Sequence, residues 1–283
     1  MDGRWRRNRV ALLAIVIATV PGACAAPAIM PSPVDMVMPA EPTPAAPLVA
    51  GLAGTSPSTV DGASTGPFGI AAQQPATSPA RIPACTYSDV PAVQAAYDDW
   101  AHTRVDTTYR LSKSYVPPDL VPVSRAGING SGQVRAIVVA DLRAMARAAR
   151  KAGAPLAVRS AYRSYRRQAA VFAGWVAVSG REEAMRFSAR PGHSEHQLGT
   201  AVDLEAAGGP APWQHTFAHT RQGRWVARNS WRFGFVISYP RALEAVACYG
   251  AEAWHVRYVG REEARKVHRS GLTLREWLWL HED

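Results

Sequence analysis

The chain has 283 residues, of which 47% are hydrophobic and 19% are charged. This composition is typical of a globular protein and excludes a chain that is disordered throughout. Lysine and arginine total 32 against 22 acidic residues, for a net charge of +10, which favours an anionic partner. Three cysteines are too few for a fold held together mainly by disulfides.

The N-terminus has the layout of a secretory signal. Arginines within residues 4–9 precede an apolar stretch over residues 10–20, and small residues follow around Cys24. The apolar stretch is shorter than the roughly 18 residues that span a bilayer, and the order of these parts predicts a signal peptide or lipoprotein signal over residues 1–26. Cleavage, lipidation of Cys24 and an uncleaved anchor remain alternatives. We expect an exported chain, in the cell envelope or outside the cell, that meets the membrane only through such an anchor.

Two segments follow the signal. Residues 27–83 are rich in Pro, Ala, Gly, Ser and Thr and poor in charge, which predicts a disordered tether. Residues 84–283 form the predicted folded domain. Its basic character favours an anionic cell envelope, because nucleic acid fits the charge but not the compartment. In an oxidising compartment the two remaining cysteines, Cys85 and Cys248, are expected to pair; two buried thiols are the alternative.

The predicted elements of the folded domain alternate between helices and short strands. Apolar spacing, helix-ending glycines and β-branched runs predict helices over 91–105, 133–152, 166–179, 181–187, 217–231, 262–270 and 273–281, and strands over 156–160, 200–205, 233–238 and 254–259. This order predicts an α+β fold with a small central antiparallel sheet flanked by helices.

Two short segments carry candidate chemistry. His196 and Asp203 are separated by a turn at Gly199, so the imidazole and the carboxylate can meet. In the second segment, His255 begins a strand-forming run, and Glu252 is three residues earlier. Residues three apart on a strand face opposite ways, so Glu252 is expected in the turn before the strand, leaning over the site that His255 faces.

Two histidines and one carboxylate are the ligand set of a catalytic zinc ion with one position left for water. A nearby glutamate can take a proton from that water. Single histidines carry little information, but two segments that each supply part of one site predict a zinc centre. His193 also lies close in sequence and is expected at the rim of the site or behind it.

The motifs resemble those of the VanY-type D-alanyl-D-alanine carboxypeptidases. The first metal motif is Ser194-x-His196-x-x-Gly199-x-Ala201-x-Asp203, the second is Glu252-x-x-His255, and the segment Ser160-Ala161-Tyr162-Arg163-Ser164-Tyr165-x-x-Gln168 resembles the family's substrate-binding segment. The resemblance implies a hedgehog-like zinc peptidase fold and one zinc ion held by His196, Asp203 and His255.

The same resemblance implies the roles of the other site residues. Glu252 matches the catalytic base, and Arg163 matches an arginine that contacts the substrate near its scissile bond. Arg163 could pair with the substrate's terminal carboxylate or with the oxygen that becomes negative during hydrolysis. Gln168 and Ser188 are expected to contact the substrate; a solvated helix residue and a helix-ending serine are the alternatives.

The implied activity is a zinc D,D-carboxypeptidase that removes the terminal D-Ala from peptidoglycan stem peptides. An L,D-carboxypeptidase, a D,D-dipeptidase and a wall endopeptidase are alternatives within the same chemistry. A non-catalytic zinc-containing wall-binding module is the alternative outside it, and Glu252 argues against that module because a purely structural site has no use for a base.

Overall fold

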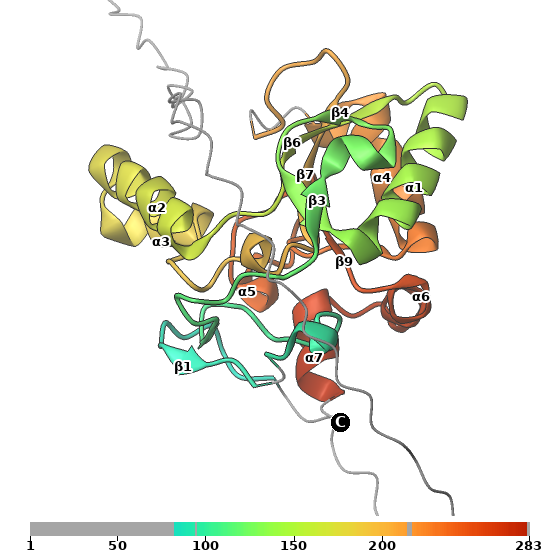
Figure 1. Ribbon diagram of the computed structural model, residues 1–283. Coiled ribbons are helices and arrows are strands. Elements are labelled where there is room, and N and C mark those ends of the chain that lie inside the picture. The colour runs from blue at the N-terminus through green and yellow to red at the C-terminus, as the bar shows by residue number, and fades with distance from the viewer. Residues whose placement is uncertain (1–81, 94, 214–216, 282–283) are drawn as a thin grey trace, which may run out of the picture. The chain divides into compact units, whose positions relative to one another are not determined.

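A computed structural model describes residues 82–93, 95–213 and 217–281 (Figure 1). The predicted signal over residues 1–26, with Cys24, and nearly all of the predicted tether over 27–83 lie outside these residues. None of the helices in the described part of the chain combines the length and the apolar character needed to cross a membrane.

A five-stranded sheet forms the centre of the domain. Its strand order is β4-β6-β7-β9-β8, and neighbours pair antiparallel except for β4 and β6, which are parallel. The strands are β4 (Asn129–Gly130), β6 (Leu156–Ser160), β7 (Ala201–Ala206), β8 (Phe235–Ile237) and β9 (His255–Tyr258). The predicted α+β class with a small central antiparallel sheet is confirmed. Strand β4, which pairs parallel to β6, was not predicted.

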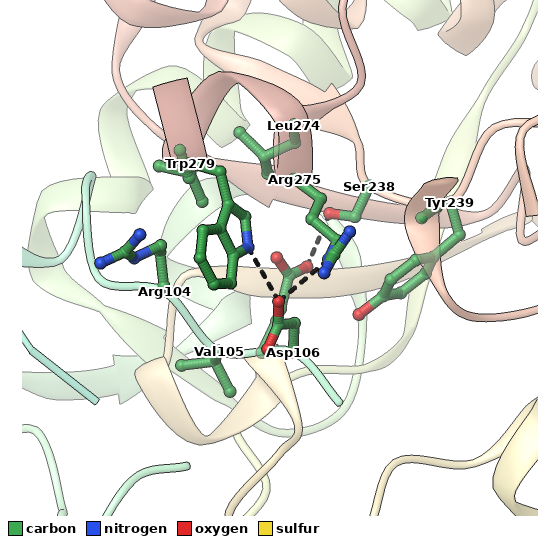
Figure 2. A pocket seen from close by; sticks show the side chains of 11 residues that line it. Arg104, Val105, Asp106, Ser238, Tyr239, Leu274, Arg275 and Trp279 are labelled. Atoms are coloured by element: carbon green, nitrogen blue, oxygen red, sulfur yellow. Dashed lines mark hydrogen bonds and ion pairs between the residues drawn. The ribbon is translucent and has the colours of Figure 1, made fainter. Parts of the chain in front are cut away.

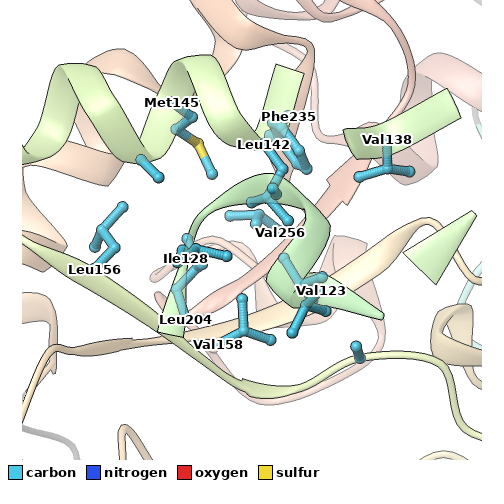
Figure 3. Packing of buried hydrophobic residues seen from close by; sticks show 14 of the residues in the cluster. Val123, Ile128, Val138, Leu142, Met145, Leu156, Val158, Leu204, Phe235 and Val256 are labelled. Carbon is cyan, nitrogen blue, oxygen red and sulfur yellow. The ribbon is translucent and has the colours of Figure 1, made fainter. Parts of the chain in front are cut away.

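One face of the sheet carries the main hydrophobic core. Helices α1 (Val139–Lys151) and α4 (Arg221–Asn229) cover this face, and Figure 3 shows α1 side chains above those of the strands. Val202, Leu204 and Val256 point into this core. Because side chains alternate along a strand, the residues between and beside them point to the opposite face, which is where the polar site lies.

The remaining helices and strands surround this centre. Their bounds are α2 (Tyr165–Ser179), α3 (Arg181–Phe187), α5 (Glu244–Ala247), α6 (Arg261–Ser270) and α7 (Leu274–Leu280), with two small sheets made of parallel β1 (Val90–Pro91) and β2 (Tyr109–Arg110) and of antiparallel β3 (Leu120–Pro122) and β5 (Gln133–Arg135). Ser164 caps α2, and Thr273 with Glu276 forms a capping box on α7, as such residues do at helix N-termini.

Three predicted helices are wrong in part. The segment 91–105 has only a short 3-10 turn, Tyr97–Asp99. The backbone carbonyls of Trp100 and Thr103, which follow this turn, accept hydrogen bonds from the buried Arg257 instead of continuing a helix. The predicted helix over 133–152 begins only at Val139, since its first residues pair with β3. The segment 217–231 is interrupted by 3-10 turns on both sides of α4.

The start and the end of the domain are joined covalently. Cys85 and Cys248 form a disulfide with their Cα atoms 5.3 Å apart, which is the predicted pairing. A second, non-covalent junction lies nearby, where the Asp106 carboxylate accepts hydrogen bonds from Arg275 and Trp279 of the C-terminal helix. The disulfide closes a loop with a sequence separation of 163, which contributes about 5 kcal/mol in the chain-entropy account of disulfides.

Candidate active site

Three predicted ligands meet on the polar face of the sheet. Asp203 on β7 lies directly opposite His255 on β9 in the antiparallel register. His196 belongs to the 3-10 helix η5 (Glu195–Leu198), which ends at Gly199 with φ of +72°. Glycine takes this left-handed conformation without strain, and the tight turn lets η5 fold back over the start of β7.

The donor atoms of these residues converge as a metal site requires. One ligand atom from each of His196, Asp203 and His255 lies within 4.8 Å of the others, and all three residues are buried. The Nε2 atom of His196 is 3.2 Å from one carboxylate oxygen of Asp203, and the Nδ1 atom of His255 is 3.1 Å from the other. The carboxylate therefore sits between two ring nitrogens of the kind that bind zinc.

The outer nitrogen of each imidazole has a partner of its own. The Nδ1 atom of His196 is 2.7 Å from the carbonyl oxygen of Ala161, and the Nε2 atom of His255 is 2.8 Å from a carboxylate oxygen of Glu195. Metal-binding histidines usually donate their second N–H in this way, which fixes the tautomer. The residues present thus fit a cation with two nitrogen ligands and one oxygen ligand.

The ionisable groups of the site are buried and shift the pKa values of one another. Burial alone raises the pKa of Asp203, but the facing His196 and His255 hold this pKa well below its usual value. Burial opposes the charge of His255 in the same way, yet its bonds to Asp203 and Glu195 raise its pKa to about 10. The cluster therefore attracts positive charge at the position between the rings and the Asp203 carboxylate, as a cation site should.

Glu252 lies where the spacing argument predicted. It precedes β9 in an irregular segment, and its Oε2 atom is 3.8 Å from the Nδ1 atom of His255. Its side chain is 22% exposed, so a water molecule can reach it from solvent. Burial raises the pKa of Glu252, and a cation next to it would lower this pKa again. The carboxylate is placed to exchange a proton with a molecule at the cation site.

Arg163 lies in the loop after β6, and its guanidinium group reaches the ligand cluster at Asp203. Its Nη2 atom lies 3.7 Å from Asp203 Oδ2, and it also donates to the hydroxyl of Ser160 at 3.0 Å. The other guanidinium nitrogen, Nη1, donates to the side-chain oxygen of Gln168 at 2.8 Å. A fixed positive charge therefore stands beside the ligand cluster.

Gln168 and Ser188 are buried side by side next to Arg163. Gln168 is 1% exposed; its oxygen accepts from Arg163, and its nitrogen donates to the carbonyl of Ala189 at 2.6 Å. Ser188 is also buried, and its hydroxyl lies 3.4 Å from the same nitrogen. Gln168 thus holds Arg163 and is itself held by Ala189 and Ser188, and the expected contact of Gln168 and Ser188 with the substrate stays a prediction.

His193 is not part of the ligand cluster, nor does it lie at the rim. It is fully buried, with Nδ1 at 2.7 Å from the carbonyl of Asp106 and Nε2 at 2.9 Å from the carboxylate of Asp89. The imidazole thus ties the N-terminal segment to the loop before η5. Burial lowers the pKa of His193 below the usual 6.5, although both partners oppose this shift.

This shift predicts a pH-dependent stability. Between the lowered pKa of His193 and 6.5, the unfolded chain binds a proton that the folded chain does not. The free energy of unfolding should therefore fall as pH falls from about 7.5 toward the lowered pKa, with a slope of at most about 1.4 kcal/mol per pH unit from this group. Urea unfolding of wild type and His193→Asn at several pH values measures it. The variant should show the shallower slope, and equal slopes would contradict the assignment; the metal ligands are common to both proteins.

Two buried residues beside the ligand cluster were missed by sequence reasoning. Glu195 lies inside the first metal motif between Ser194 and His196, and its carboxylate contacts His255. Arg257 lies two residues after His255 on β9 and donates to Glu195 at 3.1 Å. The period of two along a strand could have placed Arg257 on the same face as His255.

A small cavity borders the site on the Glu195 side. Figure 2 shows Ser238, Tyr239 and Arg275 around it, with Asp106 bonded to Arg275 and Trp279. Glu195 lines this cavity, whereas the three ligands do not. It is therefore a gap behind the ligand cluster rather than the substrate site.

An α+β domain with two histidines and one aspartate around a cation position, and with a separate glutamate beside it, defines the class of zinc-dependent peptidases. The family described as VanY, D-alanyl-D-alanine carboxypeptidase, matches residues 131–261. The structure titled as a vancomycin-resistance D,D-pentapeptidase VanY mutant with Zn(II) is 30% identical, with a TM-score of 0.54, over 63% of this chain and 99% of that one. The chain belongs to the VanY family.

Two further proteins are similar. The LdcB LD-carboxypeptidase structure is 34% identical with a TM-score of 0.58, covering 63% of this chain and 85% of that one. YodJ of Bacillus subtilis (strain 168) is 38% identical over 177 residues, which are 61% of this chain and 65% of YodJ. The chain thus spans slightly less than two thirds of YodJ. The zinc-bound VanY structure indicates zinc as the cofactor of this family, and His196, Asp203 and His255 are the group among the described residues that could hold one such ion.

Proposed function

We propose that this protein is a zinc D,D-carboxypeptidase that removes the terminal D-Ala from peptidoglycan stem peptides. The observation that carries the proposal is the placement of Glu252 at 3.8 Å from His255 Nδ1, on the side where the ligand atoms converge. A purely structural zinc site needs no free carboxylate there. Family membership and the structure titled as a complex of VanYB with D-alanine-D-alanine support the substrate class.

The side chains divide the work of amide hydrolysis. A zinc ion held by His196, Asp203 and His255 would lower the pKa of a water toward about 7 and would polarise a carbonyl. Glu252 accepts a proton from the attacking water and can return it to the leaving amine. Arg163 supplies positive charge to the terminal carboxylate or to the oxygen on which negative charge develops. Gln168 and Ser160 keep the guanidinium in place through the bonds described above.

An L,D-carboxypeptidase is the second candidate, because the LdcB LD-carboxypeptidase is among the similar structures. Defined stem peptides separate the two. The proposed D,D-activity releases one D-Ala from a pentapeptide and stops at the tetrapeptide, whereas an L,D-enzyme converts the tetrapeptide to the tripeptide. Release of the D-Ala-D-Ala dipeptide from the pentapeptide would indicate a dipeptidase instead. Mass spectrometry of the products distinguishes all three outcomes.

Arg163→Ala should weaken hydrolysis without loss of zinc. Hydrogen bonds to charged groups contribute about 1.5–3 kcal/mol, which corresponds to a fall in kcat/KM of about 10–150-fold. If the guanidinium binds the terminal carboxylate, KM should rise with little change in kcat; if it stabilises the developing oxyanion, kcat should fall with little change in KM. Steady-state kinetics on a pentapeptide decides between the two. Unchanged values of both parameters would remove Arg163 from the reaction.

We also propose that the chain is exported to the cell envelope. The disulfide between Cys85 and Cys248 is a bond that persists in oxidising compartments. Exposed basic residues of α1 and α4 fit an anionic envelope surface; they are Arg143, Arg147, Arg150, Lys151, Arg221, Arg224 and Arg228. Cell fractionation with thiol alkylation tests the proposal. Envelope-located chain with both cysteines bonded is expected, and cytoplasmic chain with free thiols would contradict it.

A further inference from the structure

Glu195 is a buried carboxylate that the proposed reaction does not use. It is 4% exposed and begins η5, next to the ligand His196. Its Oε2 atom is 2.8 Å from His255 Nε2 and also accepts a hydrogen bond from the hydroxyl of Ser238 at 2.6 Å. An isolated carboxylate is costly to bury, so this group needs both a counter-charge and a reason to be there.

Arg257 supplies the counter-charge. It is fully buried, and its Nη1 atom donates to Glu195 Oε1 at 3.1 Å. Its Nη2 atom donates to the carbonyls of Trp100 and Thr103 at 3.0 and 2.8 Å. Trp100 and Thr103 both precede residues 131–261, the part of the chain that matches the VanY family. The position of Glu195 is thus fixed from outside the ligand motifs, by an arginine that is itself held by the backbone of another segment.

The two glutamates near His255 contact different nitrogens of its ring. Glu252 lies at Nδ1, the nitrogen that faces Asp203, whereas Glu195 lies at Nε2. A group at Nε2 is on the wrong nitrogen to serve as the proton acceptor at the cation site. It is on the right one to receive the N–H of an imidazole whose other nitrogen binds a metal.

We propose that Glu195 is a positioning residue that accepts the Nε2–H of His255 and so commits Nδ1 to zinc, with Arg257 holding Glu195 in place. The inference rests on the proposed zinc site. It assigns Glu195 a part in metal affinity and in the orientation of one ligand, not in proton transfer. His196 needs no such side chain, because its Nδ1 atom meets the backbone carbonyl of Ala161.

The tautomer of His255 in the zinc-loaded wild-type protein tests this directly. In ¹⁵N-labelled protein, long-range ¹H–¹⁵N correlation spectra should show Nε2 protonated and Nδ1 without a proton. Nδ1 protonated, with Nε2 free of a proton, would overturn the proposal. This measurement needs no variant and no substrate, so its result is independent of whether the protein hydrolyses any peptide.

Zinc affinity gives the second readout. Loss of such an outer partner typically weakens metal binding 10–100-fold, so Glu195→Ala should raise the zinc Kd by about that factor in competition with a chromophoric chelator. Glu195→Gln retains an acceptor oxygen but not the charge, and its Kd should lie between those of Glu195→Ala and wild type. Folded Glu195→Ala and Glu195→Gln proteins with wild-type zinc affinity would refute the positioning role. If Glu195→Ala does not fold, Glu195→Gln and the wild-type spectrum decide.

Asp141→Asn is the matched control. Asp141 also accepts hydrogen bonds from an arginine and a tyrosine, Arg261 and Tyr258, both at 2.8 Å, but it lies on α1 across the sheet from the ligands. Its replacement should leave the zinc Kd unchanged even if stability falls. An equal loss of zinc affinity in Asp141→Asn and Glu195→Ala would show that the effect reports general stability, and would contradict a specific role for Glu195.

Discussion

Glu252→Gln should lower the rate of peptide hydrolysis by about 10²–10⁴-fold while the protein keeps its zinc, because general acid–base catalysis contributes about this factor. Glutamine has nearly the same shape as glutamate but cannot accept the proton. Glu252 is not one of the three residues whose ligand atoms converge, so its replacement leaves the ligand set intact. The fall should appear in kcat, measured on a defined pentapeptide with zinc content determined on the same sample.

Glu244→Gln is a suitable control for Glu252→Gln. Glu244 begins α5 and its carboxylate contacts only a local backbone N–H, that of Ala242, among the bonds of the described residues. Its variant should hydrolyse the peptide at the wild-type rate. A Glu252→Gln enzyme that retains zinc and turns over within a few-fold of wild type would show that another group is the base.

Removal of any one zinc ligand should abolish activity through loss of the metal. His196→Ala, Asp203→Ala and His255→Ala each leave two ligands where the site has three, and each also leaves buried charged or polar partners unpaired. Zinc content after dialysis should fall from about one ion per chain to a small fraction of that value. Atomic absorption or inductively coupled plasma mass spectrometry measures this.

His193→Ala distinguishes ligand loss from a general effect of removing a buried histidine. His193 contacts Asp89 and the carbonyl of Asp106 rather than the ligand cluster, so its variant should lose stability but keep zinc. If His193→Ala loses the metal while His196→Ala retains it, the ligand assignment is wrong.

The ligand residues could be predicted from the sequence because each lies in a short motif with a strong local constraint. Gly199 marks a turn and the β-branched run after His255 marks a strand, so the placement of Glu252 before that strand followed from side-chain alternation. The strand over 156–160 and the helices over 181–187 and 262–270 were also found nearly residue for residue, because their local patterns agree with the pairing and packing that they have in the folded chain.

The features that could not be predicted from the sequence depend on contacts between segments that are distant along the chain. The segment 91–105 has helical spacing, but carbonyls at its end bond to Arg257, more than 150 residues later in the chain. Tertiary contacts of this kind override local propensity. The bonds that the Gln168 amide makes to Arg163 and to Ala189 could not be predicted, because Ala189 is 21 residues away in the chain. Glu195 was missed because its partners, Ser238 and His255, are more than 40 residues later in the chain.

Hydrolysis of a defined stem pentapeptide with and without a metal chelator tests the central claim most directly. The account predicts release of a single D-Ala by the zinc-loaded protein, loss of this activity when the chelator removes the metal, and recovery when zinc is restored. Release of D-Ala that continues undiminished in protein shown to be free of metal would contradict a zinc-dependent carboxypeptidase, and so would a zinc-loaded, folded protein that leaves the pentapeptide and the tetrapeptide intact.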